Sequence, residues 1–275
     1  METINSLVTA LFTLALKPLA GVDAVWSVVA VSIVAGVVLA LAYGKLSNQN
    51  GLKRVKRYIT SGMYESVIFR HDLRLSLGAQ ARMLLGGLRY VALAIPPILL
   101  LLIPSILILA QLNSRFGYRP LNPGEKTVVT LKAISDDLLF ESELKSSVGL
   151  EISPPVRDLD QRSVTWRIDT PTTLSPKAAQ LFELSVAGET SAQPIYIGDR
   201  PALIATLTSR SFFDQLLYPG SALPSNLAKD IESISVEYPQ AALSLAGLNT
   251  NWLALFALIS ITSGLVASRV FGIEV

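Results

Sequence analysis

Residues 24–43 have the sequence AVWSVVAVSIVAGVVLALAY, an apolar stretch without a charged side chain. A helix needs about 20 apolar residues to cross the hydrocarbon core of a bilayer, which is about 30 Å thick. Two further stretches, residues 90–112 and 250–268, also lack charged side chains, and Trp252 would anchor the latter at the membrane interface. The sequence therefore predicts a membrane α-helical bundle with three transmembrane helices.

The composition of the 275-residue chain agrees with a membrane protein. Hydrophobic residues make up 51% of the chain and charged residues 16%, whereas about a quarter of the residues are charged in soluble domains. The formal net charge is only +2, so no general basic field indicates DNA as a partner. Cysteine is absent and His71 is the only histidine, which excludes disulfides and cysteine-ligated metals and leaves little for zinc chemistry.

The loop between the first two predicted spans is strongly basic. Residues 44–89 contain nine Lys and Arg against Glu65 and Asp72, and the positive-inside rule places such a loop in the cytoplasm. The N-terminus is then outside, and residues 269–275 form a cytoplasmic tail. Because no organellar targeting feature is present, we expect the plasma (inner) membrane of a prokaryote. The alternative is a signal peptide cleaved after residues 40–42, but its basic residues should precede the apolar region, and here they follow it.

Two amphipathic patterns within residues 44–89 predict a cytoplasmic helical hairpin. Apolar residues recur at steps of three or four on both sides of a polar turn at residues 69–72, which is typical of two antiparallel helices. The first pattern comprises Leu52, Val55, Ile59, Met63 and Val67, and the second comprises Leu73, Leu77, Ala81, Leu84, Leu85 and Leu88. The second helix would continue almost directly into the span at residues 90–112.

The basic side chains of this hairpin form a candidate contact surface. They are Lys53, Arg54, Lys56, Arg57, Arg70, Arg74 and Arg82. Near a membrane, each would attract anionic headgroups by about 1 kcal/mol. Ribosomal RNA or a nascent chain are other partners of the right charge, and a solvated face that only sets the topology is the third alternative.

Residues 113–249 have the composition of a soluble domain, which we expect on the extracytoplasmic side. Alternating or β-branched segments between turn residues predict strands at 126–134, 148–152, 163–168, 181–187, 194–197 and 234–238, with short helices at 203–217 and 226–231. Val164, Trp166 and Ile168 alternate with polar residues, so we expect them in the core. This pattern favours an all-β, immunoglobulin-like sandwich.

Residues 1–23 place apolar side chains at near-helical spacing before Lys17, Pro18 and Gly21. They predict an amphipathic helix that either lies along the outer membrane surface or packs on the spans.

Motifs for catalysis are missing from the sequence. It contains no G-x-S-x-G turn, phosphate loop, H-E-x-x-H motif or glycine-rich dinucleotide turn. Acidic pairs such as Asp136 and Asp137 are typical of solvated loops, and a calcium site there is the less favoured alternative. The predicted spans carry no ionisable group of the kind that a proton or ion pathway needs. We therefore expect no enzyme, cofactor or metal.

The arrangement of these segments resembles the YidC-type membrane-protein insertase superfamily. The resemblance rests on the N-terminal helix ending in Lys17-Pro18, on Trp26 at the outer end of the first span, and on the basic hairpin that leads into the second span. The residues Lys45-Leu46-Ser47-Asn48-Gln49 look like the exit from the first span in that superfamily. The three-helix plan is closest to the archaeal and endoplasmic-reticulum members, which lack the large domain between the second and third spans.

The resemblance implies a membrane-protein insertion or biogenesis factor that shields a client segment in a polar groove between its helices. Bacterial members carry an arginine in this groove, whereas the first span here offers only serines. The candidate groove-lining residues are Ser27, Ser32, Ser260, Thr262 and Ser263. The implied partners are the lipid bilayer, nascent membrane proteins or the ribosome, and other membrane subunits. The alternatives are a membrane-anchored structural or adhesion protein whose β-sandwich binds a partner, and a subunit of a transporter or secretion complex.

Overall fold

The computed structural model describes residues 9–10, 12–14, 16–17, 22–146, 149–172, 177–198, 203–220, 223, 229–245 and 248–274. The chain divides into two compact units. The helical unit comprises residues 25–106 and 254–275, and the β-rich unit comprises residues 1–24 and 107–253. Most of the amphipathic helix predicted at residues 1–23 lies outside the described residues.

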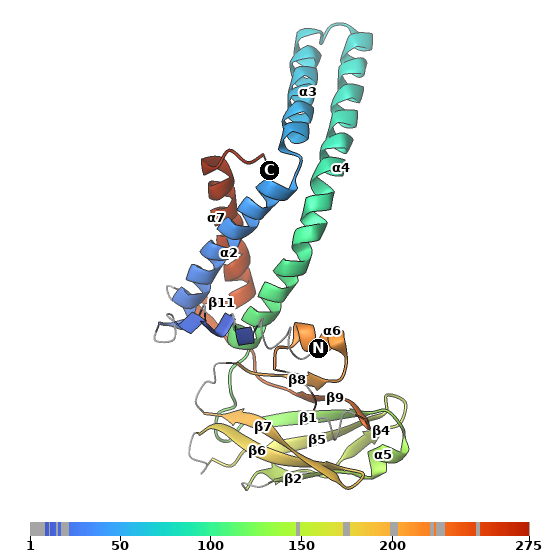
Figure 1. The fold of residues 1–275 in the computed structure, drawn as a ribbon, viewed down its shortest axis with the longest axis vertical. Coiled ribbons are helices and arrows are strands. Elements are labelled where there is room, and N and C mark those ends of the chain that lie inside the picture. Colours follow the sequence, from blue (N-terminus) through green and yellow to red (C-terminus); the bar gives the residue numbers. More distant parts are fainter. Residues whose placement is uncertain are drawn as a thin grey trace. The chain divides into compact units, whose positions relative to one another are not determined.

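Among the described residues, three helices are long and apolar enough to cross a membrane, as predicted. They are α2 (Ala24–Leu46), α4 (Leu73–Leu112) and α7 (Trp252–Val270). The long helix α4 (Figure 1) joins the second predicted hairpin helix and the second predicted span without a break, although Pro96, Pro97 and Pro104 lie inside it. It continues into one turn of π-helix, η2 (Asn113–Gly117).

The helical hairpin consists of α3 (Gln49–Ile68) and the first half of α4 (Figure 1). Their contact is made by small residues. A Cβ atom added at Gly62 would lie 2.8 Å from the Met83 side chain and 3.3 Å from the carbonyl oxygen of Ala79. Gly86 faces the Ile59 side chain in the same way. The two backbones therefore approach closely where side chains are missing.

Side chains cap the beginning of both hairpin helices. The Asn48 side-chain oxygen accepts a hydrogen bond from the Gly51 N–H at 2.9 Å, at the start of α3. The Asp72 carboxylate accepts bonds from the Arg74 and Leu75 N–H groups, at the start of α4. Such caps satisfy backbone donors that have no partner within the helix, so they determine where each helix begins.

Helices α2 and α7 also meet through small residues. A Cβ atom at Gly36 would overlap the carbonyl oxygen of Ser260 and the hydroxyl of Ser263. A Cβ atom at Gly264 would lie 3.3 Å from the carbonyl oxygen of Gly36. Ser32 and Gly36 on α2 are four residues apart, as are Ser260 and Gly264 on α7. This spacing places small residues on one helix face and allows two membrane helices to pack tightly.

The described part of the β-rich unit contains antiparallel sheets. The strands are β1 (Lys126–Ala133), β2 (Ser142–Ser146), β3 (Glu151–Ile152), β4 (Val156–Asp158), β5 (Ser163–Asp169), β6 (Lys177–Val186), β7 (Glu189–Ile197), β8 (Leu207–Ser209), β9 (Ile231–Val236), β10 (Leu243–Leu245) and β11 (Leu248–Thr250). The largest sheet has the order β3-β5-β1-β9-β8, with β4 also paired to β5. A second sheet has the order β2-β6-β7, and β10 pairs with β11. The short helices are α5 (Asp137–Phe140) and α6 (Phe212–Leu217).

The two larger sheets share one hydrophobic core. Trp166 from β5 is 2% exposed, and Phe182 from β6 is fully buried in the same cluster. Val164 and Ile168 are buried beside Trp166, whereas Arg167 is exposed. The alternation predicted for residues 163–168 is therefore confirmed, because successive side chains of a strand point to opposite faces of the sheet.

The prediction for residues 203–217 is wrong over much of its length. Only α6 is helical there, and the preceding β8 pairs with β9, with Leu207 opposite Ser235. Pairing with a distant strand overrides the local helical pattern. Of the helix predicted at residues 226–231, residues 226–228 lie outside the described residues and Ile231 already belongs to β9. β2, β4, β8, β10 and β11 are absent from the prediction, because strands of three to five residues carry little periodicity.

Candidate functional site

A continuous row of exposed apolar side chains runs along one face of α4. At 100° per residue these side chains fall within an arc of about 80°. We call them the α4 stripe. They are Leu73, Leu77, Ala81, Leu84, Leu88, Val91, Ile95, Leu99, Leu102 and Ile106, and all ten are exposed. The stripe begins in the hairpin and continues through the apolar span.

The α4 stripe points away from α3. The face of α4 that contacts α3 carries Ala79, Met83 and Gly86, and Ala79 is fully buried. Leu84, on the opposite face, is 68% exposed. The leucine periodicity thus predicts the helix correctly, but its apolar face is not the one that closes the hairpin. Glycine and alanine form that contact because they let the backbones approach.

The α4 stripe is longer than a hydrocarbon core is thick. From residue 73 to residue 106 an α-helix rises about 50 Å, against about 30 Å of hydrocarbon. If the apolar span lies in the bilayer, leucines such as Leu77 and Leu84 extend beyond it. Each fully exposed leucine that becomes buried contributes about 1.5–3 kcal/mol. A contiguous apolar surface in water marks an interaction site.

The five hydroxyl side chains predicted to line a groove lie in different surroundings. Ser27 and Ser32 of α2 are buried, and the Ser32 hydroxyl donates to the Val28 carbonyl oxygen at 2.6 Å. Ser260 and Ser263 of α7 are half-buried at the contact with Gly36. Thr262 is exposed. Ser260, Thr262 and Ser263 each donate to a carbonyl oxygen of their own helix. Near Gly36, Ser260 and Ser263 lie where α2 and α7 are in close contact.

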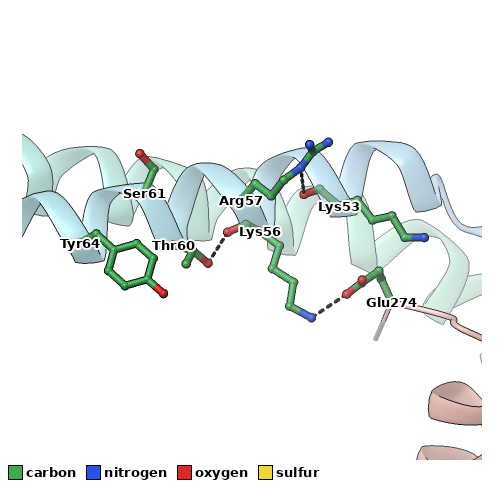
Figure 2. A pocket seen from close by; sticks show the side chains of 7 residues that line it. All are labelled: Lys53, Lys56, Arg57, Thr60, Ser61, Tyr64 and Glu274. Carbon is green, nitrogen blue, oxygen red and sulfur yellow. Dashed lines mark hydrogen bonds and ion pairs between the residues drawn. The ribbon is translucent and has the colours of Figure 1, made fainter.

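A basic groove of about 670 Å³ lies along α3 (Figure 2). Its lining residues are Lys53, Lys56, Arg57, Thr60, Ser61, Tyr64 and Glu274. Three of the seven basic residues predicted as a contact surface therefore meet in one place. They do so because Lys56 and Arg57 follow Lys53 by three and four residues, and positions three or four apart are neighbours on a helix surface.

The C-terminal segment supplies the acidic group in this groove. The Glu274 carboxylate accepts a hydrogen bond from the Lys56 ammonium at 2.6 Å. The Glu274 N–H donates to the Gln49 side-chain oxygen at 2.7 Å, and a Cβ atom at Gly44 would meet the Ile273 side chain at 2.8 Å. The hydrogen bond and the charge of Lys56 lower the pKa of Glu274, and the same bond raises the pKa of Lys56.

The other predicted basic residues lie elsewhere on the hairpin. Arg54 is exposed on α3, and Arg70 and Arg74 are exposed at the hairpin turn. Arg82 of α4 forms an ion pair with Glu65 of α3. The turn lies about 20 Å along the helix from Lys56. Among the described residues, no group of three or more His, Asp or Glu gathers as a metal site requires.

No family model, curated protein or solved structure matches the chain.

Two features of these sites were not predicted from the sequence. Glu274 lines the basic groove and its N–H bonds to Gln49, and no local pattern links residues 225 positions apart. Gly36 and Gly264 make the α2–α7 contact. In that case a signal is present, because small residues four positions apart in an apolar segment are typical of helix contacts in membranes.

Proposed function

We propose that the protein is a membrane-protein insertion or biogenesis factor of the YidC type. The α4 stripe receives an apolar segment of the client on the cytoplasmic side and leads it into the bilayer. The observation that supports this proposal is the continuity of the stripe. The exposed leucines of the hairpin and those of the span lie on the same helix face.

Burial of apolar surface provides the driving force in this mechanism. A client segment outside the membrane exposes about 20 apolar residues to water. Packing against Leu77, Leu84 and Leu88 removes apolar surface from water on both partners. Because the stripe continues on α4, the client exchanges one apolar contact for another as it moves toward lipid. The polar groove expected from the resemblance is replaced in this proposal by the apolar α4 stripe.

The proposal includes a location and an orientation. The three apolar helices span a prokaryotic plasma membrane, with the hairpin in the cytoplasm and the N-terminus outside. The nine basic residues within residues 44–89 support this orientation. The two β-sheets with a common core form an immunoglobulin-like sandwich on the outer side.

Site-specific crosslinking tests the role of the stripe. The natural chain has no cysteine, so Leu84→Cys introduces a single thiol on the α4 stripe. Leu75→Cys is the matched control, because Leu75 is an exposed leucine of α4 that lies outside the stripe. We expect a thiol-specific crosslinker to join Leu84→Cys, and not Leu75→Cys, to a stalled nascent membrane protein with one cysteine in its apolar segment. Equal crosslinking of both variants, or of neither, contradicts the proposed function.

The orientation has a separate test. Arg70→Cys lies at the hairpin turn and Lys145→Cys lies in β2, and both positions are exposed. In intact cells a membrane-impermeant thiol reagent should label only Lys145→Cys, and in inverted vesicles only Arg70→Cys. Labelling of both from the same side would exclude the three-span topology.

A second candidate function is partner binding by the β-rich unit. A cavity of about 290 Å³ lies between β7 and the β8–β9 edge, with Phe182, Gln193 and Tyr196 among its lining residues. This cavity suits a small apolar group or side chain. If crosslinkers placed at Gln193 capture a partner while Leu84→Cys captures no client, the second candidate replaces the first.

A further inference from the structure

The basic groove on α3 lies close to the ends of two apolar helices. Lys53 follows the last residue of α2 by seven positions, and Glu274 follows the last residue of α7 by four. Ser47 and Asn48 separate the two helices, and Lys53 is the fifth residue of α3, about 7 Å of helix from its beginning. The headgroup layer extends about 5–7 Å beyond the hydrocarbon on each side, and lysine side chains can reach several ångströms further. Side chains at the base of the groove are therefore within reach of headgroups.

The charges in the groove do not balance. Lys53, Lys56 and Arg57 contribute three positive charges, and Glu274 contributes one negative charge. The hydroxyls of Ser61 and Tyr64 line the same space. The Lys53 and Lys56 ammonium groups can donate to a phosphate group, which offers several acceptor oxygens. The Arg57 guanidinium points to the other side of α3 in Figure 2, so it adds its positive charge to the local field without facing Lys56.

The groove already holds an anion supplied by the chain itself. Figure 2 shows the Glu274 carboxylate next to the Lys56 ammonium, at the same end of the groove as Lys53. Because the Lys56 side chain is 59% exposed, a competing anion can approach it from solvent. The carboxylate thus marks where an external anion would bind.

We infer that this groove binds the phosphate of an anionic phospholipid headgroup and that Glu274 competes with it for Lys56. Lipid is the source of phosphate that fits the position of the groove beside the span ends. Binding would fix the base of α3 at the membrane surface, and release would return Lys56 to Glu274. The inference requires the apolar helices to lie in a bilayer, but it does not depend on the insertion function.

Titration of the full-length protein in detergent micelles tests this inference. A fluorophore on Met63→Cys reports from an exposed position that does not line the groove. The probes are dioctanoyl phosphatidylglycerol, dioctanoyl phosphatidylcholine and inorganic phosphate. Each is titrated into the labelled parent and into three variants, K53Q/R57Q, R70Q/R74Q and E274Q, after circular dichroism has verified equal helicity.

The expected changes differ in sign between the variants. At about fivefold per cation, which corresponds to about 1 kcal/mol, K53Q/R57Q should weaken phosphatidylglycerol binding about 25-fold. R70Q/R74Q removes the same charge at the hairpin turn and should change it less than about threefold. E274Q should tighten binding about fivefold, a gain that a misfolded protein would not show.

Several results would overturn the inference. Equal affinity for phosphatidylglycerol and phosphatidylcholine would exclude selection of an anionic headgroup. Inorganic phosphate binding as tightly as phosphatidylglycerol would exclude lipid as the preferred source. Equal losses of phosphatidylglycerol affinity in K53Q/R57Q and R70Q/R74Q would show that only the net charge matters. Unchanged or weaker binding by E274Q would exclude competition between Glu274 and the headgroup for Lys56.

Discussion

Replacing Gly36 with alanine should destabilise the helical unit, whereas the same replacement at Gly87 should not. At Gly36 the added Cβ overlaps the Ser260 carbonyl oxygen and the Ser263 hydroxyl across the α2–α7 contact. At Gly87 in α4, apart from its chain neighbours and the backbone of its own helix, no described heavy atom lies within 4 Å of the added Cβ. The two variants therefore make the same chemical change in different surroundings.

Two opposing effects determine the size of the change. Alanine is favoured over glycine within a helix by about 1 kcal/mol, and this gain applies at both positions. Overpacking costs about 1–3 kcal/mol. The upper part of that range applies at Gly36, because a backbone carbonyl cannot turn aside as a flexible side chain can. Gly36→Ala should therefore lower the free energy of unfolding by about 2 kcal/mol, and Gly87→Ala should raise it by up to about 1 kcal/mol.

Unfolding of the full-length protein in mixed micelles, with increasing fractions of sodium dodecyl sulfate, measures this difference. Helicity is followed by circular dichroism. Gly36→Val, which adds two further methyl groups, should unfold at still lower detergent fractions than Gly36→Ala. If Gly36→Ala is as stable as Gly87→Ala, the close contact between α2 and α7 is refuted.

Three further predictions concern local interactions. Arg119 donates two 2.8 Å hydrogen bonds to Glu125 and lowers the pKa of the Glu125 carboxyl group from 4.5 to about 2. The stabilisation from this pair is complete above pH 4.5 and is lost as the pH falls toward 2. The difference in thermal stability between the natural chain and Glu125→Gln should therefore shrink over that range. Phe182→Ala should cost about 3–5 kcal/mol in denaturant unfolding followed by Trp fluorescence, whereas Phe213→Ala, at a position 72% exposed, should cost less than about 0.5 kcal/mol. Asn48→Ala removes the side-chain cap of α3 and should lower the local stability of its first turn by about 1 kcal/mol. Amide hydrogen exchange in that turn should become faster, and unchanged exchange there would contradict the capping role.

The apolar helices were predictable because their cause is local. Crossing hydrocarbon demands a certain length without charge, and a helix satisfies its own backbone hydrogen bonds. Both conditions are visible in residues 24–43 alone. The turn at residues 69–72 was also predictable, because its polar residues interrupt the apolar pattern of their neighbours in the sequence. The core position of Trp166 was predictable from alternation, because strand geometry alone sends neighbouring side chains to opposite faces.

The surfaces of these elements were not predictable in the same way. Periodicity shows that Leu77 and Leu84 share a helix face, but it does not show what covers that face. The glycine contact at Gly62 leaves the leucines exposed. β8 was missed because its partner β9 lies more than twenty residues away, and a strand of three residues has no stability without that pairing.

The sequence by itself determined the three apolar helices, the basic hairpin and the alternating strands, since each follows from the chemistry of neighbouring residues. Only the tertiary structure decided that α2 and α7 meet at glycines, that the α4 stripe stays uncovered and that Glu274 enters the groove beside Lys56. The physical reason is that these contacts join residues far apart in the chain. Which face of a helix is covered depends on how closely another backbone can approach it.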